Sequence, residues 1–396
     1  MRIAFFSDVF YPELSGIADS ILLTGSELAR RGHTVHYYVP FYSDHEYKQA
    51  NVNVREPELP DGAKVFRLSS RRFTGPTGMG RAIWPNLLDG VRTHERYDLA
   101  HVHTFFGAGL DALTFAKRHQ LPLVGTNHTY IESYLQYSPV RFEWIKTLAV
   151  WYVRWFHDRC ALVSTPSQFL TKHMQETGSH VPMVTVSNPI APEFFVSRLS
   201  KDALKKEFGM KGHVVLYVGR LAAEKNVMTL LEAFIRLSKG DKTTELVMVG
   251  MGPEYVALFA RAKRAKLTDR VHILGPYLGE NKQKLYDLFH LADIFAFPSK
   301  SDTQSMTTLQ AFAASTPAAV ARIGPLPDLV ANNRGLTFEP DNVPELLEIL
   351  TKLVRDPVLC GIMGKSARAF AEKYSVKAVA DEWEKLYTSV LKNVKN

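Results

Sequence analysis

Short apolar runs rich in β-branched residues alternate with longer segments of helical period along the chain. This alternation is typical of a parallel sheet with helices on its faces. In the first half we predict a helix from Ile17 to Arg31, and the segment from Arg141 to Arg159 also has helical spacing. The strands predicted there are Arg2 to Ser7, Thr34 to Pro40, Lys64 to Arg67, Leu99 to His103, Leu123 to Thr126, Leu162 to Thr165 and Met183 to Val186.

The pattern breaks after Asn188 and Pro189 and restarts at His213. The second half predicts strands Val214 to Val218, Glu245 to Val249, Val271 to Leu274, Ile294 to Phe297 and Ala319 to Arg322. Its predicted helices are Met228 to Leu237, Tyr255 to Ala265, Lys282 to Leu291, Thr307 to Ala314, Pro344 to Val354 and Val358 to Ala371. The fold class is therefore α/β, with Rossmann-like doubly wound domains at 1–190 and 213–374, a linker at 191–212 and an amphipathic helix within 375–396.

Composition narrows the functional classes. The 396 residues carry 48 Lys and Arg against 40 Asp and Glu, a net charge of +8. This surplus suits phosphate-bearing ligands, an anionic membrane surface or nucleic acid. We exclude nucleic acid as a partner, since the aromatic residues are not interleaved with a basic strand face in any recognised module.

Targeting features point to the cytoplasm. Cys160 and Cys360, each within a predicted helix, indicate neither a disulfide framework nor a zinc site. The N-terminal apolar run breaks at Asp8, which is too short for a signal peptide, and no run reaches the roughly 20 residues needed to span a bilayer. We expect a cytoplasmic protein whose membrane association, if any, is peripheral on the inner face of the cell membrane.

Loops at the carboxyl ends of parallel strands are where ligands bind in this fold class. Gly16 precedes the first helix, where backbone amides can approach a phosphate, although a glycine there also serves turn geometry. Arg220 and Lys225 follow the strand that ends at Val218, and together they can neutralise a diphosphate.

A third loop, from Pro298 to Gln310, is rich in hydroxyls and amides, which suits recognition of a sugar. Asp302 in the loop and Gln310 in the following helix are its candidate ligand-binding residues. We expect no metal ion: His101 and His103 lie near a strand end, and we expect them to point to opposite faces.

Several ordered segments together identify the chain as similar to glycosyltransferase family 4, the retaining enzymes of GT-B fold. These segments are VGRLAAEKNVMTLLEAF, VMVGMGPE, ILGPY and LYDLFHLADIFAFPS, and with the terminal helix they extend the resemblance over essentially the whole chain. The resemblance implies two domains that face each other across a cleft, with the C-terminal helix returning to the first domain. It also implies a nucleotide sugar as co-substrate and no further cofactor.

The resemblance also implies roles for individual residues. His128 would lie beside the donor sugar and acceptor, and Arg220 with Lys225 would stabilise the leaving diphosphate. The candidate catalytic residues are thus His128, Asp302, Arg220 and Lys225. The donor-binding set is Gly16, Arg220, Lys225, Gly250, Ser305, Met306, Thr307 and Gln310.

The sequence departs from the family in the third loop. Asp302 and Gln310 stand where the family usually has two glutamates, and Ser305 and Met306 replace a glycine and an aliphatic residue. The second position keeps hydrogen-bonding capacity but loses its charge. Reduced activity, altered donor choice and a non-catalytic binder of nucleotide sugars are the alternatives that this departure opens.

The residues that bind the acceptor are expected in the first domain. Trp144, Leu148, Trp151 and Trp155 recur at helical spacing near basic residues; we favour a core-facing helix for most of this stripe, with a lipid interface as the alternative. A basic segment from Arg67 to Arg81, including Arg71 and Arg72, is predicted to be a mobile loop that meets anionic headgroups.

The nearest subgroup by resemblance is the diacylglycerol glucosyltransferases and related glycolipid synthases, through Asp302-Thr303-Gln304 and Asn127-His128-Thr129. The predicted reaction moves a hexose, glucose from UDP-glucose, to a lipid acceptor such as diacylglycerol. A soluble saccharide acceptor is the alternative. Donor base and sugar, acceptor and oligomeric state are left open by the sequence.

Overall fold

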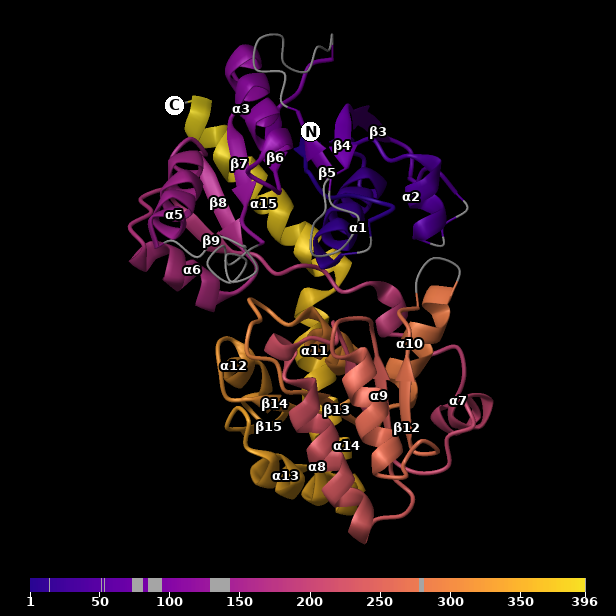
Figure 1. The fold of residues 1–396 in the computed structure, drawn as a ribbon. Coiled ribbons are helices and arrows are strands. Elements are labelled where there is room, and N and C mark those ends of the chain that lie inside the picture. The colour runs from indigo at the N-terminus through magenta and orange to yellow at the C-terminus, as the bar shows by residue number, and fades with distance from the viewer. Residues whose placement is uncertain are drawn as a thin grey trace. The chain divides into compact units, whose positions relative to one another are not determined.

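Two separate parallel sheets form from the apolar runs of the sequence. The computed structural model describes residues 1–396 except 14, 51, 53, 73–80, 85–94, 129–142, 278–280 and 396. One unit comprises Met1–Pro189 with Val376–Asn396, and the other comprises Ile190–Ser375. The prediction of two doubly wound α/β domains is confirmed (Figure 1).

The first unit contains a seven-stranded parallel sheet in the order β3-β2-β1-β6-β7-β8-β9. Its strands are β1 Arg2–Phe6, β2 Thr34–Pro40, β3 Ala63–Leu68, β6 Leu99–Val102, β7 Leu123–Thr126, β8 Leu162–Thr165 and β9 Met183–Thr185, and a separate antiparallel pair is β4 Ser70–Arg72 with β5 Arg81–Ile83. Its helices are α1 Gly16–Arg30, α2 Asp44–Gln49, α3 Gly107–His119, α5 Glu143–His157, α6 Gln168–Glu176 and α15 Val376–Lys395.

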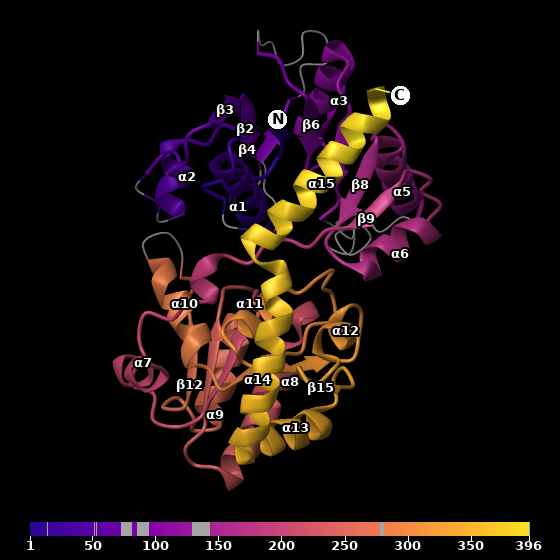
Figure 2. The same cartoon turned by 180° about the vertical axis from the view of Figure 1, so that it is seen from behind.

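Alternating side chains of β1 divide the core of this unit into two layers. Ile3 and Phe5 pack with α1 and with Trp383 and Tyr387 of α15, whereas Phe6 packs with α3 and α5 on the opposite face. The period of two in a strand produces this division. The expected return of the C-terminal helix to the first domain is confirmed, because α15 completes one of its two hydrophobic layers (Figure 2).

The second unit contains a six-stranded parallel sheet in the order β12-β11-β10-β13-β14-β15. The strands are β10 Val214–Val218, β11 Glu245–Val249, β12 Val271–Leu274, β13 Ile294–Phe297, β14 Ala318–Ala321 and β15 Gly335–Phe338. The α-helices are α7 Lys201–Glu207, α8 Val227–Gly240, α9 Tyr255–Arg264, α10 Lys282–Leu291, α11 Met306–Ala313, α12 Leu326–Val330, α13 Val343–Arg355 and α14 Pro357–Ala371, and short 3-10 helices are η1 Pro192–Phe194, η2 Ala223–Lys225 and η4 Glu372–Tyr374.

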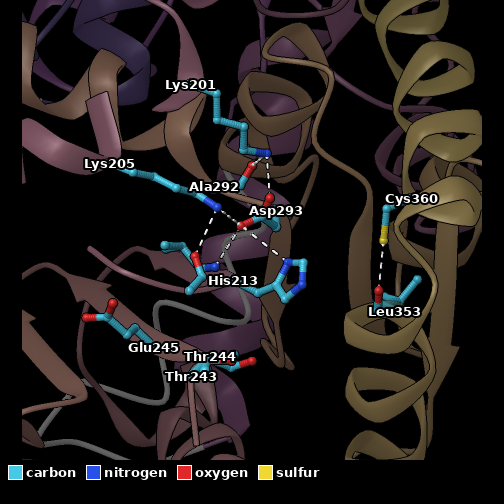
Figure 3. A network of polar contacts seen from close by, with 12 residues as sticks. Lys201, Lys205, His213, Thr243, Thr244, Glu245, Ala292, Asp293, Leu353 and Cys360 are labelled. Carbon is cyan, nitrogen blue, oxygen red and sulfur yellow. Dashed lines mark hydrogen bonds and ion pairs between the residues drawn. The ribbon is translucent and has the colours of Figure 1, made fainter. Parts of the chain in front are cut away.

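Residues 191–212, expected to be a linker, carry η1 and α7 and lie within the second unit. Two lysines of α7 hold this segment to the start of β13: Lys201 Nζ lies 2.7 Å from Oδ1 of Asp293, and Lys205 Nζ lies 2.7 Å from Oδ2 (Figure 3). Burial acts to raise the pKa of Asp293, but the two ammonium groups outweigh it and the pKa is lowered. The carboxylate therefore stays charged and anchors α7 to the sheet.

The fold shows where the two cysteines lie. Cys360 lies in α14 as predicted, but Cys160 lies after the end of α5 and is buried there. In the part of the chain that is described, no helix is both long enough and apolar enough to cross a bilayer.

Candidate functional site

The candidate donor site in the second unit lies at the point where the strand order reverses. β10 is flanked by β11 and β13, which are reached from it in opposite directions along the sheet. A crevice forms at the carboxyl ends of strands at such a reversal, and ligands of doubly wound sheets bind there. This strand order brings together the loops after β10 and β13, which with the start of α11 carry most of the predicted donor-binding residues.

Lys225 and Asp302 meet across these two loops. Nζ of Lys225 donates a hydrogen bond to Oδ2 of Asp302 at 2.9 Å, and the two side chains are 18% and 16% exposed. Lys225 ends η2, and its ammonium also lies 6.0 Å from the ring centroid of Phe297 in β13. The lysine is therefore held next to the β13 loop instead of extending into solvent.

Arg220 is fixed by its backbone as well as by its side chain. The Tyr217 hydroxyl donates to the carbonyl oxygen of Arg220 at 2.8 Å, and Nη1 of Arg220 lies 3.5 Å from Oε1 of Glu224. Arg220 and Lys225 thus provide two cations on one short loop at the end of β10. Such a pair can bind the oxygens of a diphosphate.

Gly250, predicted to bind the donor, supports the loop that carries Arg220. It has φ of 152°, and a Cβ atom at this position would lie 1.9 Å from the carbonyl oxygen of Gly219. The amide of Leu221 donates to the carbonyl of Met251 at 2.9 Å, so the loops after β10 and β11 run backbone against backbone. A side chain at residue 250 cannot be accommodated without moving Gly219.

The β13 loop ends in a left-handed residue that caps a helix. Ser305 has φ of 61°, a conformation that favours glycine, and its hydroxyl lies 2.7 Å from that of Thr308. Met306 and Thr307 form the first turn of α11, where the backbone amides lack partners within the helix. Gln310 is half-buried one turn later. This turn offers amide donors and hydroxyls to a ligand.

Gly16 is the first residue of α1 in the other unit, and it is exposed. Its neighbour Ser15 caps the helix by accepting from the amide of Ala18 at 3.1 Å. Nothing lies within 4 Å of the position that a Cβ atom of residue 16 would occupy. Packing within the chain therefore does not require glycine here, and the open space suits the close approach of a ligand to the backbone.

His128 follows β7 and is buried. Its Nε2 lies 3.3 Å from Nδ1 of His103, which follows the neighbouring strand β6. Burial lowers the pKa of His128 to about 4, with a hydrogen bond to Asn188 acting in the opposite direction. The imidazole is neutral at physiological pH and can donate or accept one hydrogen bond without bringing a charge.

The expectation that His101 and His103 point to opposite faces is wrong. Their ring centroids lie 4.1 Å apart, because residues two positions apart in a strand share a face. His101 is bonded at both nitrogens, to Tyr387 Oη and to Thr126 Oγ1, each at 2.7 Å. Among the described residues, no group of three or more His, Cys, Asp or Glu side chains is arranged to hold a metal ion.

Three supporting residues escaped the sequence analysis. Glu224 pairs with Arg220 and is recognisable afterwards from its spacing of four residues. Ser299 donates its hydroxyl to Oδ2 of Asp302, and nothing in its sequence context signals this bond. Asp8, after β1, accepts from the amide of Ala108 at 2.8 Å and so caps α3, a helix that the sequence analysis did not predict.

The apolar residues of α5 that were predicted to lie on the acceptor side are partly exposed and partly buried. Trp144, Leu148 and Trp151 of α5 are 63%, 52% and 56% exposed, so the favoured core-facing interpretation is wrong for these three. Trp155 does pack against the core. The opposite side of α5, with Val153 and Phe156, is the side buried against the sheet.

The basic segment from Arg67 to Arg81 likewise contains both an inward-facing and an exposed arginine. Arg67 lies in β3, and its guanidinium is turned inward to Glu56 at 2.9 Å and to the carbonyl oxygens of Tyr11 and Pro40, which removes it from any headgroup-binding surface. Arg71 is exposed in β4, and Arg72 ends that strand. Residues 73–80 of this segment lie outside the described residues.

Comparison with known proteins shows which family the chain resembles. The model of "Glycosyltransferase Family 4" matches residues 14–194, and that of "Glycosyl transferases group 1" matches residues 200–370. The alpha-monoglucosyldiacylglycerol synthase of Acholeplasma laidlawii is 26% identical over 402 residues, covering 99% of this chain and 98% of its own length. The synthase of the same name from Streptococcus pneumoniae is 27% identical over 324 residues, covering 80% of this chain and 70% of its own length.

Among solved structures, that of Anabaena HepE in complex with UDP has a TM-score of 0.76 at 17% identity, and the alignment covers 98% of this chain and 100% of HepE. At this identity the likeness concerns the fold. Sequence and fold together show that the chain is a glycosyltransferase of the GT-B type, with a family 4 domain in its first unit and a group 1 domain in its second.

Proposed function

We propose that this glycosyltransferase moves glucose from UDP-glucose to diacylglycerol, with retention of configuration at the anomeric carbon. The observation that carries the proposal is the pair of cations, Arg220 and Lys225, on one loop at the strand-order reversal of the second unit. Two alpha-monoglucosyldiacylglycerol synthases among the relatives support the choice of donor sugar and acceptor.

In this reaction the bond between the anomeric carbon and the diphosphate oxygen breaks while the acceptor oxygen attacks from the same face. The acceptor proton passes to the departing phosphate. Negative charge grows on the diphosphate as the bond breaks, and Arg220 with Lys225 stabilise it. The neutral His128 contributes a hydrogen bond to the sugar or acceptor, and positioning provides the rest of the rate enhancement. The two cations supply the charge stabilisation, so we expect transfer to persist in EDTA.

A lipid acceptor requires contact with a membrane, and α5 offers a surface for it. Trp144, Leu148 and Trp151 are exposed along one side of this helix, with Lys146 and Arg154 exposed beside them. Aromatic residues flanked by cations are favourable at the interface of an anionic bilayer. We propose that this side of α5 rests on the cytoplasmic leaflet.

The melting temperature of the purified protein, measured with UDP-, GDP- and ADP-sugars in turn, identifies the donor. A ligand that binds only the folded state raises this temperature. Transfer from UDP-glucose to diacylglycerol in mixed vesicles tests the reaction, and NMR of the product tests retention. Hydrolysis of the donor without transfer to lipid, or transfer to a soluble saccharide alone, would refute the lipid acceptor. Binding without either reaction would identify a non-catalytic nucleotide-sugar binder.

A further inference from the structure

The ion pair between Lys225 and Asp302 carries an inference that rests on the proposed function. Lys225 belongs to the loop after β10 and Asp302 to the loop after β13, and the two strands are neighbours in the sheet. Oδ2 of Asp302 accepts from Nζ of Lys225 at 2.9 Å and also from the hydroxyl of the buried Ser299. One carboxylate oxygen is therefore committed to two donors.

This arrangement differs from the role that family resemblance gives to Asp302, which is to bind hydroxyls of the donor sugar. Asp302 is the only acidic residue from Pro298 to Gln310, because Gln310 is neutral. The side chain of aspartate is one methylene shorter than that of glutamate, and Ser299 restrains it further on the side of β13. The single carboxylate of this loop is thus directed to the lysine.

We infer that Asp302 is a positioning residue for Lys225, which it holds and neutralises until a nucleoside diphosphate displaces it. A phosphate oxygen that contacts Lys225 competes with Asp302 for the charge of the ammonium, and it brings a second anion close to the carboxylate. Both effects weaken binding of the diphosphate. After transfer, Asp302 recaptures the ammonium and so favours release of the nucleoside diphosphate product.

The test is the affinity of the full-length protein for UDP, measured by titration calorimetry in Asp302→Asn. We expect UDP to bind this variant on the order of tenfold more tightly than the wild type, since the competing charge is gone. A structural defect alone does not tighten binding. Asp302→Ser, which also removes the carboxylate, is measured in parallel and is expected to shift affinity in the same direction.

Asp341→Asn is the matched control. It removes a carboxylate that pairs with Lys300 at 3.0 Å near the same loop, but at an exposed position. We expect its affinity for UDP to stay within about twofold of the wild type.

The outcomes separate this inference from the proposed function. Unchanged or weaker UDP binding in both Asp302 variants overturns the inference alone, and a selective loss of UDP-glucose affinity would return Asp302 to sugar binding. Equal tightening in Asp341→Asn also overturns it, because the effect would then be one of net charge. A wild-type protein that binds neither UDP nor GDP overturns the inference together with the proposed function.

Discussion

Nδ1 of His103 lies 3.3 Å from Nε2 of His128, and both rings are buried at the carboxyl ends of adjacent strands. Two neutral imidazoles can share one hydrogen bond at this distance, with one ring donating and the other accepting. Protonation of either ring would bury a charge next to a second imidazole. Acid is therefore expected to act on this part of the first unit before it acts on carboxylates elsewhere.

Stability should fall below pH 6.5 for this reason. Burial lowers the pKa of six of the described histidines: to about 4 for His128, to about 3 for His157, well below the ordinary value for His101 and His103, and in the same direction for His36 and His290. In the unfolded chain they titrate near 6.5, so between about pH 6.5 and 4 the unfolded state binds more protons. We expect the free energy of unfolding to decrease by up to about 1.4 kcal/mol per pH unit for each histidine, as measured by urea unfolding at pH 7.5, 6.0 and 5.0.

His157→Phe isolates one of these contributions. Among the described residues, neither ring nitrogen of His157 has a hydrogen-bond partner. The centroid of its ring lies 4.4 Å from the ring centroid of Phe105. Phenylalanine keeps the packing and cannot be protonated. The variant should unfold with a shallower pH dependence and be more stable than the wild type at pH 5. An identical slope would show that His157 does not contribute to it.

Lys225→Ala should lower kcat by at least about 100-fold, in line with the loss of a preorganised charge donor to the leaving group. Steady-state transfer from the nucleotide sugar measures this. Lys300→Ala, which breaks an exposed ion pair in the neighbouring loop after β13, is the control and should retain near-normal turnover. Near-normal turnover in a well-folded Lys225→Ala would contradict the assignment of the site.

Gly250→Ala should destabilise the second unit by about 2 kcal/mol or more, since its Cβ atom would collide with the carbonyl oxygen of Gly219 and its φ is unfavourable for alanine. The displaced loop carries Arg220, so transfer should fall as well. Gly240 is the last residue of α8, and the methyl group added in Gly240→Ala would have no atom within 4 Å. That variant should be neutral or slightly more stable, as thermal unfolding of the two proteins will show.

Trp144→Ser combined with Trp151→Ser should reduce co-sedimentation with anionic vesicles by about tenfold or more at constant melting temperature, because both side chains are exposed. Phe259→Ser on α9, at a half-exposed aromatic residue of the second unit, is the control and should bind vesicles like the wild type. Full vesicle binding by the double variant would exclude this side of α5 as the membrane contact.

The sequence predicts strands better than it predicts faces and contacts. β10 and β13 have the bounds expected from their apolar runs, because a strand buried on both sides is continuously hydrophobic. α3 was missed, since its N-terminus is capped from a distance by Asp8 and Gln120, which follows its last residue, replaces the glycine usual at a left-handed cap.

The candidate site was predicted residue by residue but not as a set of contacts. Arg220 and Lys225 were recognised from their place after a strand, but the partner of Lys225 is 77 positions away. Only the adjacency of β10 and β13 brings Asp302 to it. For α5, apolar residues occur on both sides of the helix, so periodicity could not decide whether Trp151 or Phe156 is buried.

The order in which α15 joins the sheet has a consequence for synthesis. The second unit, Ile190–Ser375, is an insertion between β9 and α15 of the first. On the ribosome, the second unit is fully emerged before Trp383 and Tyr387, which close one layer of the first core, have left the exit tunnel. The N-terminal unit is therefore synthesised first but completed last, and until α15 emerges the apolar layer that α15 shares with α1 is incomplete.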